Sequence, residues 1–153
     1  MFELSNVESN VQIECKITGY QFPADTKNDW CLLKVSVKQD TEFFELIDPA
    51  IESTELKNLH TWFTCLAERR LPRFASLNFT EPCISFDFLA YYNDIVRISI
   101  NLDHVLKPEF KLKQFGSSHN NWKIVFDLDV YELSKILNGI RQTLDSFPKR
   151  SEN

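Results

Sequence analysis

Asp103 and His104 are the residues best suited to chemistry, because a carboxylate beside an imidazole can orient the ring as a general base. Asp127 is a second acidic residue that could serve the same histidine. Neighbouring residues at the end of a strand usually point apart, however, and the sequence identifies no nucleophile. We therefore predict that the chain is not an enzyme. An enzyme that uses His104 with Asp103 or Asp127 stays a less favoured alternative.

The other residues that could bind a metal or react are scattered along the chain. His60 falls within a helical pattern and is predicted to be a partly buried structural residue, and His119 lies in a polar loop. Asp127 and Asp129 could bind a cation, but no further ligands accompany them. The cysteines lack zinc-type spacing and are predicted to be reduced core thiols: Cys15, Cys31, Cys65 and Cys83. The sequence therefore predicts no metal and no cofactor, and its three glycines form no phosphate-binding loop.

The distribution of charged residues indicates a function more clearly than the candidate catalytic and metal-binding residues do. Between Gln39 and Leu56 there is no Lys or Arg, and the charged residues are Asp40, Glu42, Glu45, Asp48, Glu52 and Glu55. Glu52 and Glu55 could partly serve a helix N-terminus, where anions are favoured. An acidic stretch beside an exposed Phe43 or Phe44 would suit capture of a basic protein surface. A merely solvated face explains the charges equally well, and we take these six residues as candidate binding residues.

The overall charge limits the partners of the chain. The net charge is −5 and the isoelectric point about 5.2, which argues against general binding of nucleic acid or of anionic membranes. A small basic cluster, made of Arg69, Arg70 and Arg73, is expected to complement the C-terminal end of a helix rather than to bind phosphate. No apolar run approaches the roughly 20 residues of a membrane span, and the start of the sequence lacks a secretory signal. We expect a cytoplasmic protein.

Hydrophobic periodicity predicts the elements that position these residues. Alternation with a period of two predicts strands over 11–19, 30–38, 42–47, 75–80, 83–91, 95–103 and 122–128. Helical spacing predicts two amphipathic helices, at about 53–70 and 130–146, the second capped by Asp129 and Glu132. We predict one α+β domain over 1–153: a curved, mainly antiparallel sheet of about six to seven strands, with both helices packed on one face.

Two local predictions concern the ends of elements. The stretch "GYQFPADTKNDWCLLKV" is predicted to be a hairpin in which Tyr20 packs against Trp30 and pins the loop. The charged "PKRSEN" at the end of the sequence is predicted to be frayed. Both are structural predictions, and neither segment is predicted to act on a ligand.

Several segments occur in an order that points to one family. They are "GYQFP", "NDWCLLKVSV", "FELIDPAIESTELKNLHTWF" and "LNFTEPCISFDF". A Gly-Tyr turn thus precedes an Asp-Trp-Leu strand, an acidic strand leads into a Thr-Glu-Leu helix, and a Phe-x-Glu-Pro turn leads into a strand with alternating Phe. This order resembles the WapI-type immunity proteins of bacterial contact-dependent toxin systems. The likeness covers residues 2–102 well, and the last third by its order of strand and helix.

The resemblance implies an antitoxin. Such a protein binds the toxic C-terminal domain of a secreted or surface-displayed polymorphic toxin, often a nuclease that attacks tRNA, and blocks it in the producing cell. It implies a cytoplasmic location, no catalytic residues, and inhibition by covering the active site of the partner. The matching residues are turn and core types, so the six acidic candidates depend on this sequence alone.

A small-molecule-binding or regulatory α+β module is the other alternative. It would require a deep apolar pocket, and its expected lining is Phe86, Phe88, Trp122 and Phe126. An immunity protein is instead expected to have a filled core and an exposed acidic surface.

Overall fold

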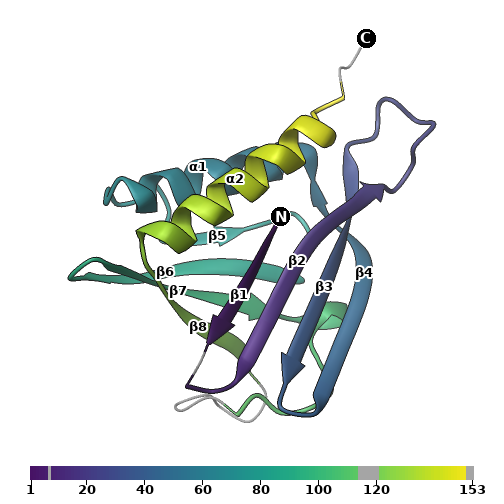
Figure 1. Cartoon of the computed structure of the whole chain (residues 1–153). Helices are drawn as coiled ribbons and strands as arrows, with labels where there is room; N and C mark the ends of the chain where they lie inside the picture. Colours follow the sequence, from purple (N-terminus) through teal and green to yellow (C-terminus); the bar gives the residue numbers. More distant parts are fainter. Residues whose placement is uncertain (7, 114–120, 151–153) are drawn as a thin grey trace.

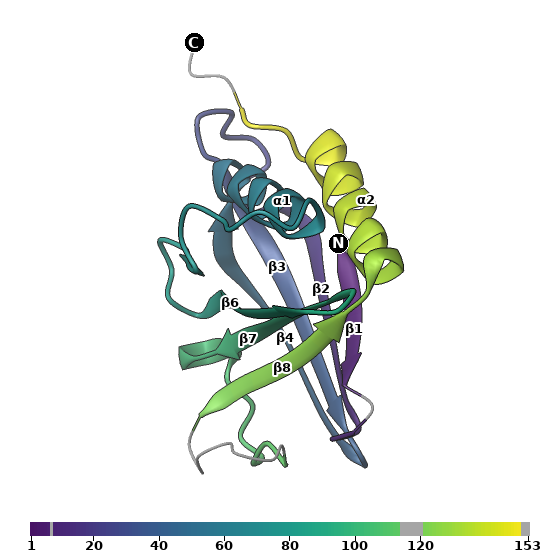
Figure 2. The same cartoon turned by 90° about the vertical axis from the view of Figure 1, so that its left-hand side faces the viewer.

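Alternating apolar and polar residues build two antiparallel sheets that pack their apolar faces together. The computed structural model describes residues 1–6, 8–113 and 121–150. Sheet A has the spatial order β1 (Phe2–Asn6), β2 (Val11–Tyr20), β3 (Trp30–Gln39), β4 (Glu42–Glu52). Sheet B has the order β5 (Ser76–Asn78), β6 (Ile84–Tyr92), β7 (Ile95–Leu102), β8 (Trp122–Leu128). The two sheets cross at a steep angle, and both helices lie together over one end (Figures 1 and 2).

The α+β class is confirmed, but the prediction of one curved sheet of six to seven strands was wrong. β4 runs directly into helix α1 (Ser53–Ala67), which carries the chain away from sheet A before β5 begins. The next strands therefore build a second ladder instead of extending the first. β1 and β8 come side by side, where the Asn6 side chain donates a hydrogen bond to the Val125 carbonyl at 2.6 Å. This bond comes from a side chain, so it does not merge the sheets.

Helix α1 ends earlier than the predicted residue 70, because its C-terminus closes in a Schellman motif. Arg69 adopts a left-handed backbone with φ of 54°. Its N–H donates to the Leu66 carbonyl, and the Arg70 N–H donates to the Cys65 carbonyl at 2.9 Å. These are the two bonds that end a helix after a left-handed residue. Apolar spacing alone does not show this, since the position usually holds glycine.

Helix α2 (Val130–Ser146) begins as predicted. The Asp129 carboxylate accepts the Glu132 N–H at 2.8 Å, and the Glu132 carboxylate accepts the Asp129 N–H at 3.0 Å. α2 packs against α1, β1 and β8, and its Gly139 lies directly against the Met1 carbonyl, with no space for a Cβ. No helix of the described residues is long and apolar enough to cross a membrane.

Aromatic side chains fill the space between the sheets and α1. Phe63 and Phe86 contact each other edge to face at 6.0 Å between ring centroids, and Phe2 contacts both at 6.2 Å. Three of the four residues expected to line a ligand pocket belong to this filled core, since Phe86, Trp122 and Phe126 are at most 3% exposed. The observed packing therefore does not support an apolar pocket at these residues.

The β2–β3 hairpin is pinned by the C-terminal segment of residues 147–150, which we call the C-terminal latch. The Tyr20 ring packs on Phe147 at 5.5 Å, and the Arg150 guanidinium lies over the same ring at 3.5 Å. These are the ring contacts of Tyr20 among the described residues, so the predicted packing of Tyr20 on Trp30 was wrong. The prediction of a frayed end was wrong for residues 148–150, and residues 151–153 lie outside the described residues.

Candidate functional site

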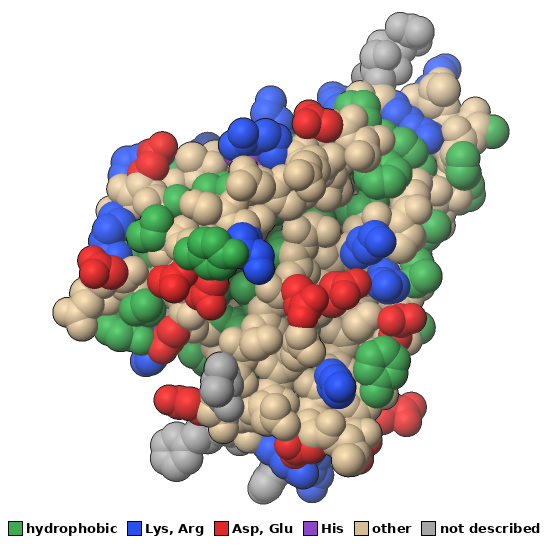
Figure 3. Space-filling view, in the orientation of Figure 1, with side chains coloured by type: hydrophobic (Ala, Val, Ile, Leu, Met, Phe, Trp, Pro, Cys, Tyr) green, Lys and Arg blue, Asp and Glu red, His purple; other side chains and the backbone are tan. Residues whose placement is uncertain are grey.

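The outer face of sheet A is a mixed polar surface with exposed apolar groups along one side. Period-two alternation places every second side chain of its strands on this face. A shallow hollow of about 270 Å³ on it is lined by Glu3, Gln12, Glu14, Lys34, Ser36, Lys38, Phe43 and Glu45. Acidic, basic and apolar groups alternate over the side of the molecule seen in Figure 3. The face therefore offers charged, polar and apolar groups for contact with another protein.

Strand β4 supplies the apolar part of this face. Phe43 is 63% exposed and Ile47 is 51% exposed, with Glu45 between them on the same side. On the neighbouring strand β3, Lys38 lies opposite Phe43, Ser36 lies opposite Glu45, and Lys34 lies opposite Ile47. Phe44 points the other way and packs against the core. Of the two phenylalanines considered from the sequence, Phe43 is thus the exposed one.

The six acidic candidates occupy three different environments. Asp40 and Glu42 are exposed at the β3–β4 turn, and Glu45 accepts a hydrogen bond from the Ser36 hydroxyl at 2.8 Å on the outer face. Asp48 is partly buried on the opposite side of β4. Glu52 and Glu55 lie at the start of α1. The structure therefore brings Asp40, Glu42 and Glu45 to the end and outer side of β4, and separates them from the other three.

Glu55 is buried, and its carboxylate is fully engaged inside the protein. One oxygen accepts the Glu52 N–H at 2.9 Å. The other accepts both the Thr80 N–H at 2.6 Å and the Thr80 hydroxyl at 2.9 Å. Glu55 thus ties the N-terminus of α1 to the segment before β6, and a structural role accounts for its charge.

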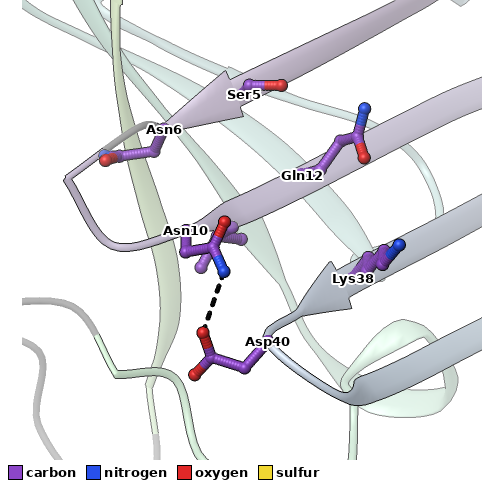
Figure 4. A pocket seen from close by; sticks show the side chains of 7 residues that line it. Ser5, Asn6, Asn10, Gln12, Lys38 and Asp40 are labelled. Carbon is purple, nitrogen blue, oxygen red and sulfur yellow. Dashed lines mark hydrogen bonds between the residues drawn. The ribbon is translucent and has the colours of Figure 1, made fainter.

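The turn that carries Asp40 borders a polar hollow of about 260 Å³ at one end of sheet A. Figure 4 shows Ser5, Asn6, Asn10, Gln12, Lys38 and Asp40 around it. The Asn10 side-chain amide donates to the Asp40 carboxylate at 2.9 Å, and both residues have a left-handed backbone with φ of 52°. The Lys113 ammonium donates to the other carboxylate oxygen of Asp40 at 3.4 Å. The β1–β2 and β3–β4 turns are therefore linked through Asp40.

These hydrogen bonds should keep Asp40 ionised in acid. The Asn10 amide first, and then Lys113, hold the pKa of the Asp40 carboxyl below its ordinary value of 3.8. Because the folded pKa is the lower one, the contribution of these bonds is present above pH 3.8 and is lost as the pH falls through the folded value. We expect Asn10→Ala to raise this pKa toward 3.8 in a carbon-detected NMR titration. Lys113→Ala should raise it less, and an unchanged pKa in Asn10→Ala would contradict the assignment.

One comparison with known proteins identifies the family. The model of the Immunity protein WapI-like family matches residues 3–148. The chain belongs to the WapI-like immunity protein family. The match begins in β1 and ends after α2, so it covers both sheets and both helices of the described fold. No curated protein and no solved structure matches the chain.

The catalytic candidates of this WapI-like protein do not converge. The Asp103 carboxylate accepts the backbone N–H of His104 at 2.8 Å, so it caps the short 3₁₀ turn η1 (His104–Leu106). Asp127 lies near the far end of sheet B, where it is paired with Arg97 at 2.7 Å and accepts the Tyr92 hydroxyl at 2.5 Å. His104 therefore has neither predicted partner positioned to orient its ring.

The remaining candidates in this WapI-like protein have structural contacts. Among the described residues, no group of three or more His, Cys, Asp or Glu side chains could hold a metal ion. In the basic cluster, Arg69 lies over the Tyr91 ring at 4.8 Å and Arg70 pairs with Glu68. His60 is partly buried on α1, where burial first, and then Arg141, lowers the pKa of its imidazole. His119 lies outside the described residues.

Sequence reasoning missed two features that border the candidate site. It predicted no strand over β1, although Phe2 and Leu4 alternate with polar residues, because the segment is only five residues long. It also ended the third strand at residue 47 without noting Ile47 as exposed. The alternation Phe43–Glu45–Ile47 was the available signal, since residues two apart share a face.

Proposed function

We propose that this WapI-like chain is a non-catalytic immunity protein that binds and neutralises the toxic C-terminal domain of a cognate contact-dependent or polymorphic toxin. It acts in the cytoplasm by covering the active site of the toxin, for which a tRNA-cleaving nuclease is the activity we expect. The observation that carries this proposal is the pair of exposed apolar residues, Phe43 and Ile47, on a strand whose charged residues are all acidic.

The chemistry of this strand fits such a partner. A nuclease needs basic groups to hold phosphate, so acidic residues on its inhibitor complement its field and speed their encounter. Asp40, Glu42 and Glu45 supply this charge at the turn and on the outer face. Buried aromatic and aliphatic anchors supply most of the affinity in protein interfaces. Phe43 and Ile47 are the anchors that β4 offers.

The test is co-expression with the toxic domain encoded next to this chain, followed by measurement of affinity. Wild type should restore growth, and the triple variant Asp40→Lys, Glu42→Lys, Glu45→Lys should bind at least about 100-fold more weakly, because like charges repel across an interface. The control reverses three exposed acidic residues elsewhere, Glu81, Asp94 and Glu109, with the same change in net charge. Equal loss in both variants would show a general charge effect and would remove β4 as the site. A toxic domain that wild type neither binds nor neutralises would overturn the proposed function.

A further inference from the structure

The two sheets have four edges, and β4 is the long open one among the described residues. β1 and β8 contact each other, and helix α2 packs against both. β5 is only three residues long. β4 has 11 residues and pairs on one side with β3. No backbone hydrogen bond joins residues 43–51 to any other described segment. An edge of this kind presents unpaired N–H and C=O groups to another chain.

Proline and irregular pairing, two devices that protect an edge, occur only in the second half of β4. Proline, inward-pointing charge, irregular pairing and covering segments all discourage strand addition. Pro49 and the inward-facing Asp48 are both in the second half, opposite the pairing irregularity between Cys31 and Leu33. The turn η1 also contacts β4.

The first half of β4, residues 42–47, pairs regularly with β3, and its one inner-side charge, Glu42, is exposed at the turn. Its sequence is "EFFELI", with neither proline nor lysine. Phe43, Glu45 and Ile47 alternate along its outer side, and the two apolar side chains are more than half exposed. Such a segment combines free backbone groups with side chains that can select a partner. It is the part of the described surface best prepared to receive a strand.

We infer that the toxin domain docks by adding one of its own β-strands to residues 42–47 of β4. This inference rests on the proposed function and specifies how that binding occurs. Main-chain hydrogen bonds to the open edge give affinity, and side chains of the added strand give specificity. Cross-strand pairing places apolar residues of the toxin beside Phe43 and Ile47, and a Lys or Arg beside Glu45.

Amide hydrogen exchange of the complex tests the backbone part of this inference. The ¹⁵N-labelled chain is compared alone and with the purified toxin domain, residue by residue. Strand addition should slow exchange of alternate amides within residues 42–47 by at least about tenfold, because only every second N–H points to the open edge. Binding that leaves all six of these amides unchanged overturns strand addition but leaves the proposed function standing. Absence of binding overturns both.

A pair of proline variants gives an independent measurement. Adjacent strand residues direct their N–H groups to opposite edges of the strand. Because proline has no N–H group, one of the two variants Glu45→Pro and Leu46→Pro loses a hydrogen bond to β3. The other variant loses an N–H group on the open edge. The variant that keeps the wild-type thermal midpoint should bind the toxin domain at least about tenfold more weakly than alanine at the same position. Equal affinity of that proline variant and its alanine counterpart would overturn strand addition. If both proline variants unfold, the exchange measurement decides.

A substitution on the outer face tests the predicted side-chain pairing. Ile47→Lys should weaken binding at least about tenfold, because it places a positive charge where an apolar contact and a neighbouring basic residue are expected. Gln12→Lys adds a lysine to the same face on the central strand β2 and should change affinity less than about threefold. Equal effects of both lysines would overturn the predicted pairing at the edge.

Discussion

Arg150→Ala is expected to lower the thermal midpoint of unfolding by about 6 °C, which corresponds to about 2 kcal/mol for a domain of this size. One guanidinium nitrogen of Arg150 donates to three carbonyls of the β2–β3 loop, those of Phe22 at 2.7 Å, Asp25 at 2.5 Å and Asn28 at 3.2 Å. The backbone N–H of Arg150 also donates to the Asp29 carboxylate at 2.7 Å. The expected loss is smaller than the sum of these bonds, because the site is partly exposed to solvent.

Two further variants isolate the guanidinium. Arg150→Lys should recover less than half of the lost stability, because an ammonium cannot reproduce the planar fork that reaches several carbonyls at once. Lys149→Ala removes an exposed cation from the neighbouring position and should leave the midpoint unchanged. Amide exchange should quicken in loop residues 21–29 of Arg150→Ala. If Arg150→Ala melts at the same temperature as Lys149→Ala, the latch does not stabilise the fold.

Glu55→Ala is expected to have the larger effect, about 3 kcal/mol or about 9 °C in the midpoint of unfolding. The alanine leaves the N–H groups of Glu52 and Thr80 without the acceptors that they have in the wild type. Three part-buried hydrogen bonds to this carboxylate are lost, each contributing about 1 kcal/mol. Thermal unfolding monitored by circular dichroism gives the measurement.

The control for Glu55→Ala is Glu42→Ala, which removes the same charge from an exposed position on β4. Its midpoint should stay within about 2 °C of wild type, because exposed charges contribute little to stability. The affinity for the toxin domain should show the opposite order. Glu42→Ala should bind the toxin more weakly than Glu55→Ala does at a temperature at which both variants are folded. A stable Glu55→Ala variant with reduced toxin affinity would instead place Glu55 in the binding surface.

The local features of this protein follow from its sequence. Apolar residues at a period of two predicted the strands from β2 to β8, and helical spacing predicted α1 and α2. Asp129 followed by Glu132 predicted the start of α2 with its hydrogen bonds, because a capping box depends on residues three apart. The order of turn and core residues also points to the immunity family whose model matches residues 3–148.

Tertiary structure decided which residues of the acidic stretch face a partner. Between Gln39 and Leu56 the sequence supplies six acidic residues without distinguishing among them. Only the fold places Glu45 on the outer face between Phe43 and Ile47. It also places Glu55 where its carboxylate accepts a hydrogen bond from Thr80, 25 positions along the chain. Burial depends on which distant segment arrives beside a residue, and periodicity does not contain that information.

The division into two sheets and the openness of the β4 edge were decided in the same way. Alternation shows that a segment is a strand, but the ladder it joins depends on long-range hydrogen bonds. The C-terminal latch is the clearest example of a contact that the sequence does not predict. Arg150 donates hydrogen bonds to backbone carbonyls, and every residue has such a carbonyl whatever its side chain. The sequence by itself determined the two helices, the strands after β1 and the family. Folding decided which edge stayed open, since an edge is defined by the neighbours that a strand does not have.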